Sequence, residues 1–363
     1  MTAIEYDLLG VVGVRLLDAD ERDAAMVDRQ LGAIRARLDR PADLSIRFVD
    51  RLDLPPLRFV DAGGSGWAGD AFVVLRSKHK APARVLLPLD RIGLEGAEIT
   101  IQRGAPAVPY LTACVNLIAL ANGALPLHAA AFVERGIGVL VTGWSKGGKT
   151  ESLLAFVSRG AEYVGDEWVY VLPNRAVMLG LPEPIRIWDW QLDQLPTVRR
   201  RVAVGDRVRL GGVGIALAAM RRTPLRRRTG WLDVLERQRC VDIAPSHLLA
   251  APTRRVPAPV DRVFFVGSHA ASQITVRPVA GDEVARRMAG SLRYELLPLW
   301  TLYQEFRYAF PERRNELLER APALQAELLG QMLDGRSCIG VEHPYPVDLR
   351  ELHAAMRAAM ETA

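Results

Sequence analysis

The feature that most constrains this chain is a glycine-rich loop at positions 143–150. A glycine, any four residues, a glycine, a lysine and then serine or threonine is a pattern typical of loops that bind phosphate groups. Its glycines let backbone N–H groups turn inward around phosphate oxygens, and the following helix points its positive end at them. The pattern therefore predicts a strand, this phosphate loop and a helix, in that order. The phosphate loop consists of Gly143, Trp144, Ser145, Lys146, Gly147, Gly148, Lys149 and Thr150.

The segments on either side of the phosphate loop agree with that order. An apolar strand is expected at 137–142, and a helix is expected at 151–158. Lys149 would reach the β- and γ-phosphates of a nucleotide, and the Thr150 hydroxyl would hold a magnesium ion. The sequence therefore predicts nucleotide binding. The alternative is a glycine-rich turn with incidental lysines.

Composition makes the two lysines of the loop more informative. The only other lysines are Lys78 and Lys80, and every other basic residue is arginine. Because arginine and alanine are abundant throughout the chain, a cluster of arginines carries less information here. The arginine-rich segment 199–228 is therefore open to two interpretations. It is either a surface for an acidic peptide or a phosphate group, or a solvated loop.

An acidic pair, Asp166–Glu167, begins 17 residues after Lys149. One helix and an expected strand at 161–165 would bring this pair back beside the loop, because ligand sites in such sheets form at strand ends. Two adjacent acidic side chains can have two different roles in catalysis. One would bind magnesium, and the other would accept the proton of an attacking hydroxyl. A solvated acidic turn is the alternative.

These segments together resemble the HPr kinase/phosphorylase family, whose nucleotide-binding fold is similar to that of phosphoenolpyruvate carboxykinase. In that family a histidine on the strand before the loop lies near the reaction centre, and an acidic pair supplies a base and a metal ligand. The resemblance implies that His128 is the active-site histidine, Asp166 the catalytic base and Glu167 a metal partner. Lys149 would belong to the catalytic group, and Thr150 and Asp166 to the metal site. The residues that carry the resemblance are 126–129, 138–145, 148–151 and 160–167.

The chain departs from the family at two positions of the motif. Lys146 stands where the family usually has glycine, and Glu167 stands where it usually has a second aspartate. A counterpart of the family's later segment, which contains glycine and arginine and is linked to phosphorylase activity, is not evident. The resemblance therefore does not extend to HPr as the substrate or to dephosphorylation.

The resemblance implies an ATP-dependent, magnesium-dependent kinase that transfers the γ-phosphoryl group to a hydroxyl, first of all a serine of a protein or peptide. One alternative is a small-molecule kinase acting on a sugar, an amino acid or a nucleoside. Another is a non-catalytic nucleotide-binding switch or scaffold, which the acidic pair argues against because binding alone requires no base. A homo-oligomer is also consistent with the family.

The expected fold class is α/β, with a boundary near residue 105. Residues 1–105 would form a smaller N-terminal α/β domain, and residues 106–363 would form an HPr-kinase-like P-loop kinase domain. In the first part, apolar residues at helical spacing predict one helix through position 38. Strands are expected at 43–49, 71–75 and 84–87, and a surface turn at Gly63–Gly66.

Further elements are expected in the second part of the chain. A helix would cover 109–121, and a single strand would cover 125–133. The segment 168–172 is a further apolar stretch. Later, a strand at 262–266 would pair with one at 273–277. Helices are expected at 283–310, 313–333 and 349–360.

Several protein classes are disfavoured by the sequence. It contains no run of about 20 uncharged apolar residues, so we expect no membrane span. Its first residues have no basic flank, which argues against a secretory signal. Cys114, Cys240 and Cys338 are scattered, so neither a disulfide framework nor a zinc site is indicated, and a cytoplasmic location is expected. No known module supports a nucleic-acid partner.

Overall fold

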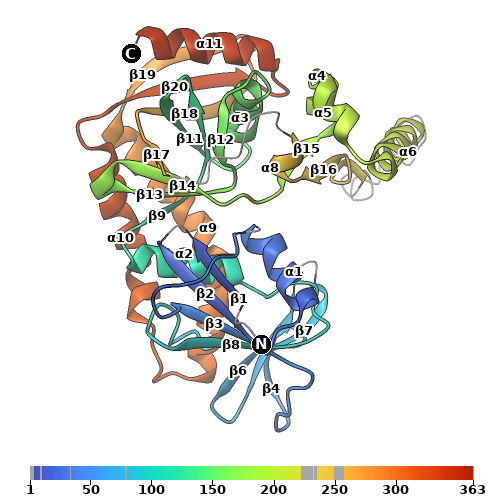
Figure 1. Cartoon of the computed structure of the whole chain (residues 1–363), viewed down its shortest axis with the longest axis vertical. Helices are drawn as coiled ribbons and strands as arrows, with labels where there is room; N and C mark the ends of the chain where they lie inside the picture. Colours follow the sequence, from blue (N-terminus) through green and yellow to red (C-terminus); the bar gives the residue numbers. More distant parts are fainter. Residues whose placement is uncertain are drawn as a thin grey trace.

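The structure of the protein is a computed structural model, and it describes residues 4–362 except 9, 33, 78–79, 222–231, 233–234 and 249–256. It has mixed sheets and helices, so the expected α/β class is confirmed. Figure 1 shows the N-terminal strands in one half of the molecule and the strands that flank the phosphate loop in the other. Among the described helices, none combines the length and apolar character that crossing a membrane requires.

The N-terminal half is built on one eight-stranded sheet. Strands β2, β3 and β8 run parallel to one another, and the remaining neighbours are antiparallel. The strands expected at 43–49, 71–75 and 84–87 correspond to β3, β6 and β7, and Gly63–Gly64 lie in the turn between β4 and β5. In spatial order the strands are β1 (Ile4–Leu8), β2 (Val12–Leu17), β3 (Leu44–Val49), β8 (Ala97–Gln102), β7 (Pro82–Leu86), β6 (Ala71–Arg76), β5 (Ser65–Ala68) and β4 (Arg58–Asp61).

The first helix is shorter than the sequence pattern predicts. Helix α1 (Glu21–Leu31) begins at a capping box formed by Asp20 and Asp23, and it ends at Gly32, which has a φ of 75°. The prediction that the helix continues through Leu38 is therefore wrong. Glycine reaches this left-handed conformation without strain, so the chain turns there. Leu38 is nevertheless buried, although the segment that contains it is not helical.

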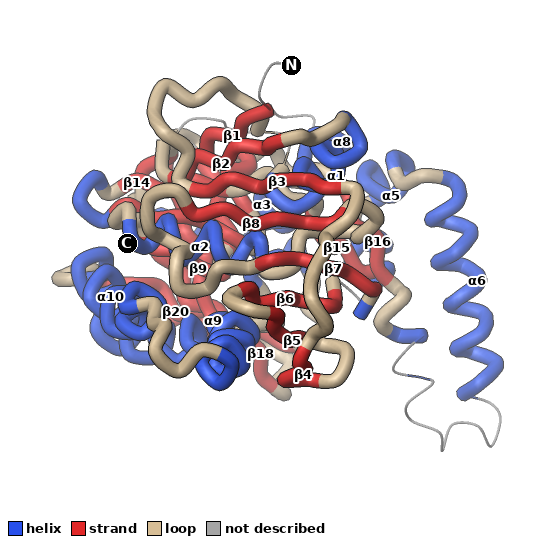
Figure 2. The backbone as a smooth tube through the Cα atoms, turned by 90° about the horizontal axis from the view of Figure 1, so that it is seen from below, coloured by secondary structure: helices blue, strands red, loops and turns tan. Residues whose placement is uncertain are grey.

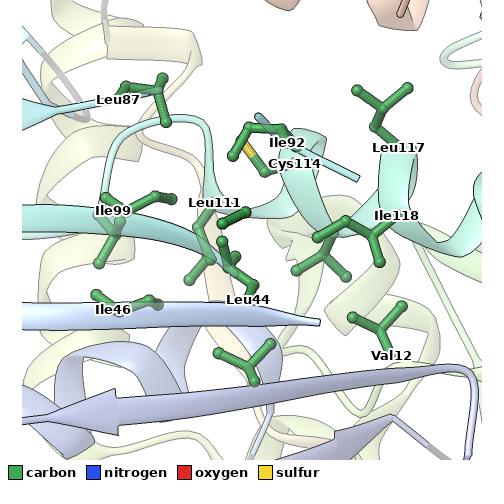
Figure 3. Packing of buried hydrophobic residues seen from close by; sticks show 14 of the residues in the cluster. Val12, Leu44, Ile46, Leu87, Ile92, Ile99, Leu111, Cys114, Leu117 and Ile118 are labelled. Atoms are coloured by element: carbon green, nitrogen blue, oxygen red, sulfur yellow. The ribbon is translucent and has the colours of Figure 1, made fainter. Parts of the chain in front are cut away.

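The apolar core of this half extends beyond the N-terminal residues. Figure 3 shows side chains of β2, β3, β8 and α2 (Leu111–Ala121) packed together. The same cluster includes Leu299, Tyr303 and Phe306 of α9 (Gly281–Ala309) and Leu318 of α10 (Glu316–Leu333). Two C-terminal helices therefore contribute to the core under the N-terminal sheet. The domain boundary near residue 105 stays a prediction.

The phosphate loop belongs to a six-stranded sheet in which β11, β18 and β20 are parallel. The expected pairing of 262–266 with 273–277 is wrong, because β20 lies between β18 and β19. In spatial order the strands are β12 (Glu162–Gly165), β10 (Ala130–Glu134), β11 (Ile137–Gly143), β18 (Arg262–His269), β20 (Ser337–Pro344) and β19 (Thr275–Ala280).

The expected single strand 125–133 is also wrong, because it is broken at Ala129. The part before the break is β9 (Leu125–His128), which pairs with β13 (Trp168–Leu172) in a separate four-stranded sheet, and the part after it is β10, which pairs with β12. The backbone N–H of Ala129 donates a 3.1 Å hydrogen bond to the carbonyl oxygen of Glu167 at the crossing point. The chain therefore passes from one sheet to the other at the same place in both segments, between β9 and β10 and between β12 and β13. The other strands of the small sheet are β14 (Val177–Gly180) and β17 (Ala258–Pro259), and the 3-10 turn η2 (Pro173–Arg175) precedes β14.

Helices cover both faces of the six-stranded sheet. Val139 and Val141 of β11 pack with α3 (Lys149–Val157) and α11 (Leu349–Thr362), whereas Leu140 faces the cluster of α9 and α10. This alternation follows from the two-residue period of a strand buried on both sides. It fixes which side chains of β11 face each layer of helices, and the phosphate loop begins where this strand ends, at Gly143.

A lateral unit carries the arginine-rich segment. Figures 1 and 2 both show helix α6 (Val204–Arg221) projecting from the body of the molecule. Arg199 contacts Asp193, and Arg209 lies 3.2 Å from Asp206, whereas the arginines at 222 and 226–228 lie outside the described residues. The other elements of the unit are β15 (Ile185–Trp188), α4 (Asp189–Gln194), α5 (Pro196–Arg201), β16 (Cys240–Ile243) and α8 (Pro245–Leu248).

We expect Phe156→Ala to destabilise the protein strongly. Phe156 of α3 is fully buried, and its ring stacks on Phe132 with 4.5 Å between centroids. Truncating such a side chain leaves a cavity and costs about 3–5 kcal/mol. Urea denaturation followed by circular dichroism measures this loss. The matched control is Phe59→Ala, since Phe59 is 58% exposed and its truncation should change the unfolding free energy by less than about 0.5 kcal/mol. Equal effects of the two substitutions would contradict the packing described.

Candidate active site

The glycines of the phosphate loop are required by close contacts. A Cβ atom on Gly143 would lie 2.2 Å from the carbonyl oxygen of Val266, and one on Gly148 would lie 1.9 Å from Nε2 of His343. Gly148 also has a φ of 105°, which side chains rarely allow. The loop is therefore held against Val266 of β18 and His343 near the end of β20, and helix α3 begins directly after it.

Lys149 is buried and folds back over its own loop. Its Nζ donates hydrogen bonds to the carbonyl oxygens of Trp144 at 2.9 Å and Gly143 at 3.3 Å. Burial lowers the pKa of this amine, and the nearby carboxylates of Asp166 and Glu167 oppose the shift. The Lys149 amine is therefore held by two carbonyl oxygens of its own loop, with the acidic pair close enough to affect its pKa.

Thr150 connects the loop to the acidic pair. Its hydroxyl lies 3.2 and 3.1 Å from the two carboxylate oxygens of Asp166, which is 3% exposed. Burial and the neighbouring charge of Glu167 raise the pKa of Asp166 to about 7, against the opposing effects of Thr150, His128 and Lys149. The sequence-predicted pair therefore does return to the loop.

His128 bridges two carboxylates. Its Nε2 lies 3.1 Å from Oε2 of Glu167, and its Nδ1 lies 2.6 Å from Oε1 of Glu295. Burial lowers the pKa of His128, but the hydrogen bonds to the two glutamates outweigh that effect and raise it to about 9. The raised pKa favours the protonated form of the imidazole at neutral pH.

The two acids of the pair have opposite electrostatic environments. The hydrogen bond from His128 lowers the pKa of Glu167, whose side chain is 45% exposed, while Asp166 is enclosed and its pKa is raised. Two neighbouring acids with separated pKa values can take different roles in proton transfer. The structure thus brings Lys149, Thr150, Asp166, Glu167 and His128 into one cluster.

The remaining loop residues differ in their exposure to solvent. Trp144 is 52% exposed and its ring lies 5.2 Å from that of Tyr294, which is also half-exposed. Lys146 is exposed with a φ of 63°, and Ser145 is half-buried. Gly147 is buried, and its N–H donates to the carbonyl oxygen of Trp144 at 3.0 Å. The side chains of Trp144 and Lys146 therefore face solvent rather than the interior of the cluster.

Sequence reasoning missed two groups of contacts. Glu295, on α9, is 167 residues from His128 in the chain, and no spacing rule connects them. Beneath the loop, the buried Glu151 accepts a 3.0 Å hydrogen bond from Gln191 of α4, and His343 of β20 is fully enclosed. Burial raises the pKa of Glu151. Only the fold brings these residues to the loop.

The side chains of the cluster fit a nucleotide–magnesium complex. Mg²⁺ binds through one or two carboxylates together with phosphate oxygens and water, so a cage of protein ligands is not needed. The hydroxyl of Thr150 and the carboxylates of Asp166 and Glu167 are suitable oxygen donors. Within the described residues, no group of three or more His, Cys, Asp or Glu side chains forms a metal site by itself.

Comparison with known proteins gives no family assignment. No protein-family model matches the chain, and no curated protein matches it.

The position of His128 predicts a pH dependence of stability. Because its pKa is raised from 6.5 to about 9, its ionisation stabilises the fold fully below pH 6.5, and this contribution is lost as the pH rises to 9. The difference in unfolding free energy between wild type and His128→Gln should fall by roughly 2–3 kcal/mol across that range. Urea denaturation at pH 6 and pH 9.5 measures it. A difference that stays constant, or grows with pH, would contradict the bridge.

Proposed function

We propose that the chain is an ATP-dependent kinase, with a P-loop kinase domain of the HPr-kinase-like type from about residue 106. The observation that carries the proposal is the contact between Thr150 of the loop and Asp166 of the acidic pair, next to the buried Lys149. A turn that served only to connect a strand to a helix would not require a buried lysine and a buried acid at its end.

The loop residues would bind the triphosphate. Lys149 would exchange its two carbonyl partners for β- and γ-phosphate oxygens, and the N–H groups at the start of α3 would face the same oxygens. Magnesium, held by Thr150 and Glu167, would neutralise charge on the phosphates. These residues act mainly by positioning and electrostatic stabilisation.

The acidic pair would act on the hydroxyl group that accepts the phosphoryl group. As the hydroxyl oxygen of the acceptor forms a bond to the γ-phosphorus, the bond from that phosphorus to the β–γ bridging oxygen breaks and ADP leaves. Asp166 would accept the hydroxyl proton, since its pKa of about 7 suits a general base at neutral pH. Glu167, whose pKa is lowered, would remain ionised. A serine of a protein or peptide is the proposed acceptor, on the basis of the family resemblance.

The test is phosphoryl transfer from γ-¹⁸O-ATP. The purified protein, Mg²⁺ and cell-extract peptides and metabolites are incubated, and labelled phosphate is located by mass spectrometry. We expect label on a peptide serine with wild type and with the control Lys80→Ala, which replaces an exposed lysine outside the loop. Lys149→Ala should abolish transfer, and Asp166→Asn should lower its rate by about 10²–10⁴-fold.

Other outcomes would change the proposed acceptor, the proposed base or the kinase function itself. Label on a metabolite would retain the kinase but replace its acceptor class with a small molecule. Tight binding of ATP that Lys149→Ala abolishes, without transfer to any acceptor, would contradict the kinase and favour a nucleotide-binding switch. A wild-type rate in Asp166→Asn would show that Asp166 is not the base.

A further inference from the structure

Glu295 lies in the cluster without a role in the proposed reaction. It comes from α9, and its carboxylate lies 2.6 Å from Nδ1 of His128. The side chain of Glu295 is 21% exposed and that of His128 is 17% exposed, so both groups are largely withdrawn from water. A short contact between a carboxylate and a ring nitrogen in such surroundings restricts the orientation of the imidazole.

The chemistry of the bridge defines the direction of each hydrogen bond. When both carboxylates are ionised, each can only accept a hydrogen bond, so that Nδ1 of His128 donates to Glu295 and Nε2 donates to Glu167. Glu295 therefore fixes the ring so that Nε2–H points at Glu167. The same arrangement, in which a carboxylate orients a histidine toward a functional group, recurs in metal sites and hydrolases.

Helix α9 gives Glu295 a fixed position. Met288, Ser291 and Leu292 precede it on this helix and Leu299 follows it by about one turn, and all four are buried. Met288 also contacts the hydroxyl of Thr142, just before the phosphate loop, at 3.2 Å. The helix is therefore held both against the sheet that carries the loop and beside the histidine.

The side chain of Glu167 depends more on a hydrogen-bond partner than the side chain of Asp166 does. Asp166 is enclosed and contacts Thr150, whereas Glu167 has a half-exposed side chain on a residue with a φ of 63°. Without a partner, an exposed glutamate samples several rotamers, and holding it in one of them costs entropy. The hydrogen bond from His128 supplies that partner.

We propose that Glu295 is a positioning residue that orients His128, so that the histidine holds Glu167 beside Asp166. Its effect on rate rests on the proposed kinase function, but its effect on the histidine does not. Glu295 is not proposed to contact the nucleotide or the acceptor.

The first test observes the histidine directly in the nucleotide-free protein. With ¹⁵N-labelled histidine, the His128 ring at pH 7 should give two protonated nitrogens and a slowly exchanging Nδ1 proton, assigned by its loss in His128→Gln. Glu295→Ala should remove the slowly exchanging proton, whereas Glu295→Gln should keep it, because the amide oxygen still accepts. The control Glu283→Ala removes another glutamate of α9, which pairs with Arg287, and should leave the His128 signals unchanged.

The second test measures phosphoryl transfer by the same variants. Glu295→Ala should lower kcat by about 10–100-fold with little change in the KM for ATP, since partners of this kind typically contribute that much. Glu295→Gln should restore most of the rate. Unchanged His128 signals in Glu295→Ala would overturn the proposal, and so would an unchanged kcat in an active enzyme. If wild type transfers no phosphate but the His128 signals change as expected, the kinase proposal fails while the positioning of His128 by Glu295 stands.

Discussion

The site depends on the close approach between the end of β11 and Val266 inside β18. Gly143 lies so near the carbonyl oxygen of Val266 that no side chain fits between them. This contact exists because β11 and β18 are parallel neighbours, buried on both faces by helices. It fixes where the backbone leaves the sheet, where α3 begins, and therefore where Lys149 and Thr150 lie.

The second constraint is the crossing of two chain segments at Ala129 and Glu167. Because β9 and β10 belong to different sheets, as do β12 and β13, the chain turns sharply at the same place in both segments. His128 precedes one turn, and Asp166 and Glu167 form the other. A continuous strand over 125–133 would not require these turns. The departure from the expected strand is thus the feature that gathers the histidine and the acids.

The local parts of this arrangement were predictable from sequence, whereas the long-range parts were not. The strand, loop and helix around Gly143–Thr150 follow from glycine placement and apolar runs, and the return of Asp166 follows from one helix and one strand. The end of α1 at Gly32 was missed because apolar periodicity continues past it in a non-helical segment. The insertion of β20 beside β18 and the contact of Glu295 with His128 depend on pairing between distant segments, which spacing along the chain does not encode.

The central claim is that the Gly143–Thr150 loop binds the phosphates of a nucleotide, and amide hydrogen exchange with and without MgATP tests it most directly. We expect slower exchange in peptides that cover 143–152 and 165–168 when MgATP is added to wild type, and no such change in Lys149→Ala. The projecting helix α6 should serve as an internal reference whose exchange does not depend on the loop. Protection confined to α6, or unchanged exchange across the loop at saturating MgATP, would contradict the claim.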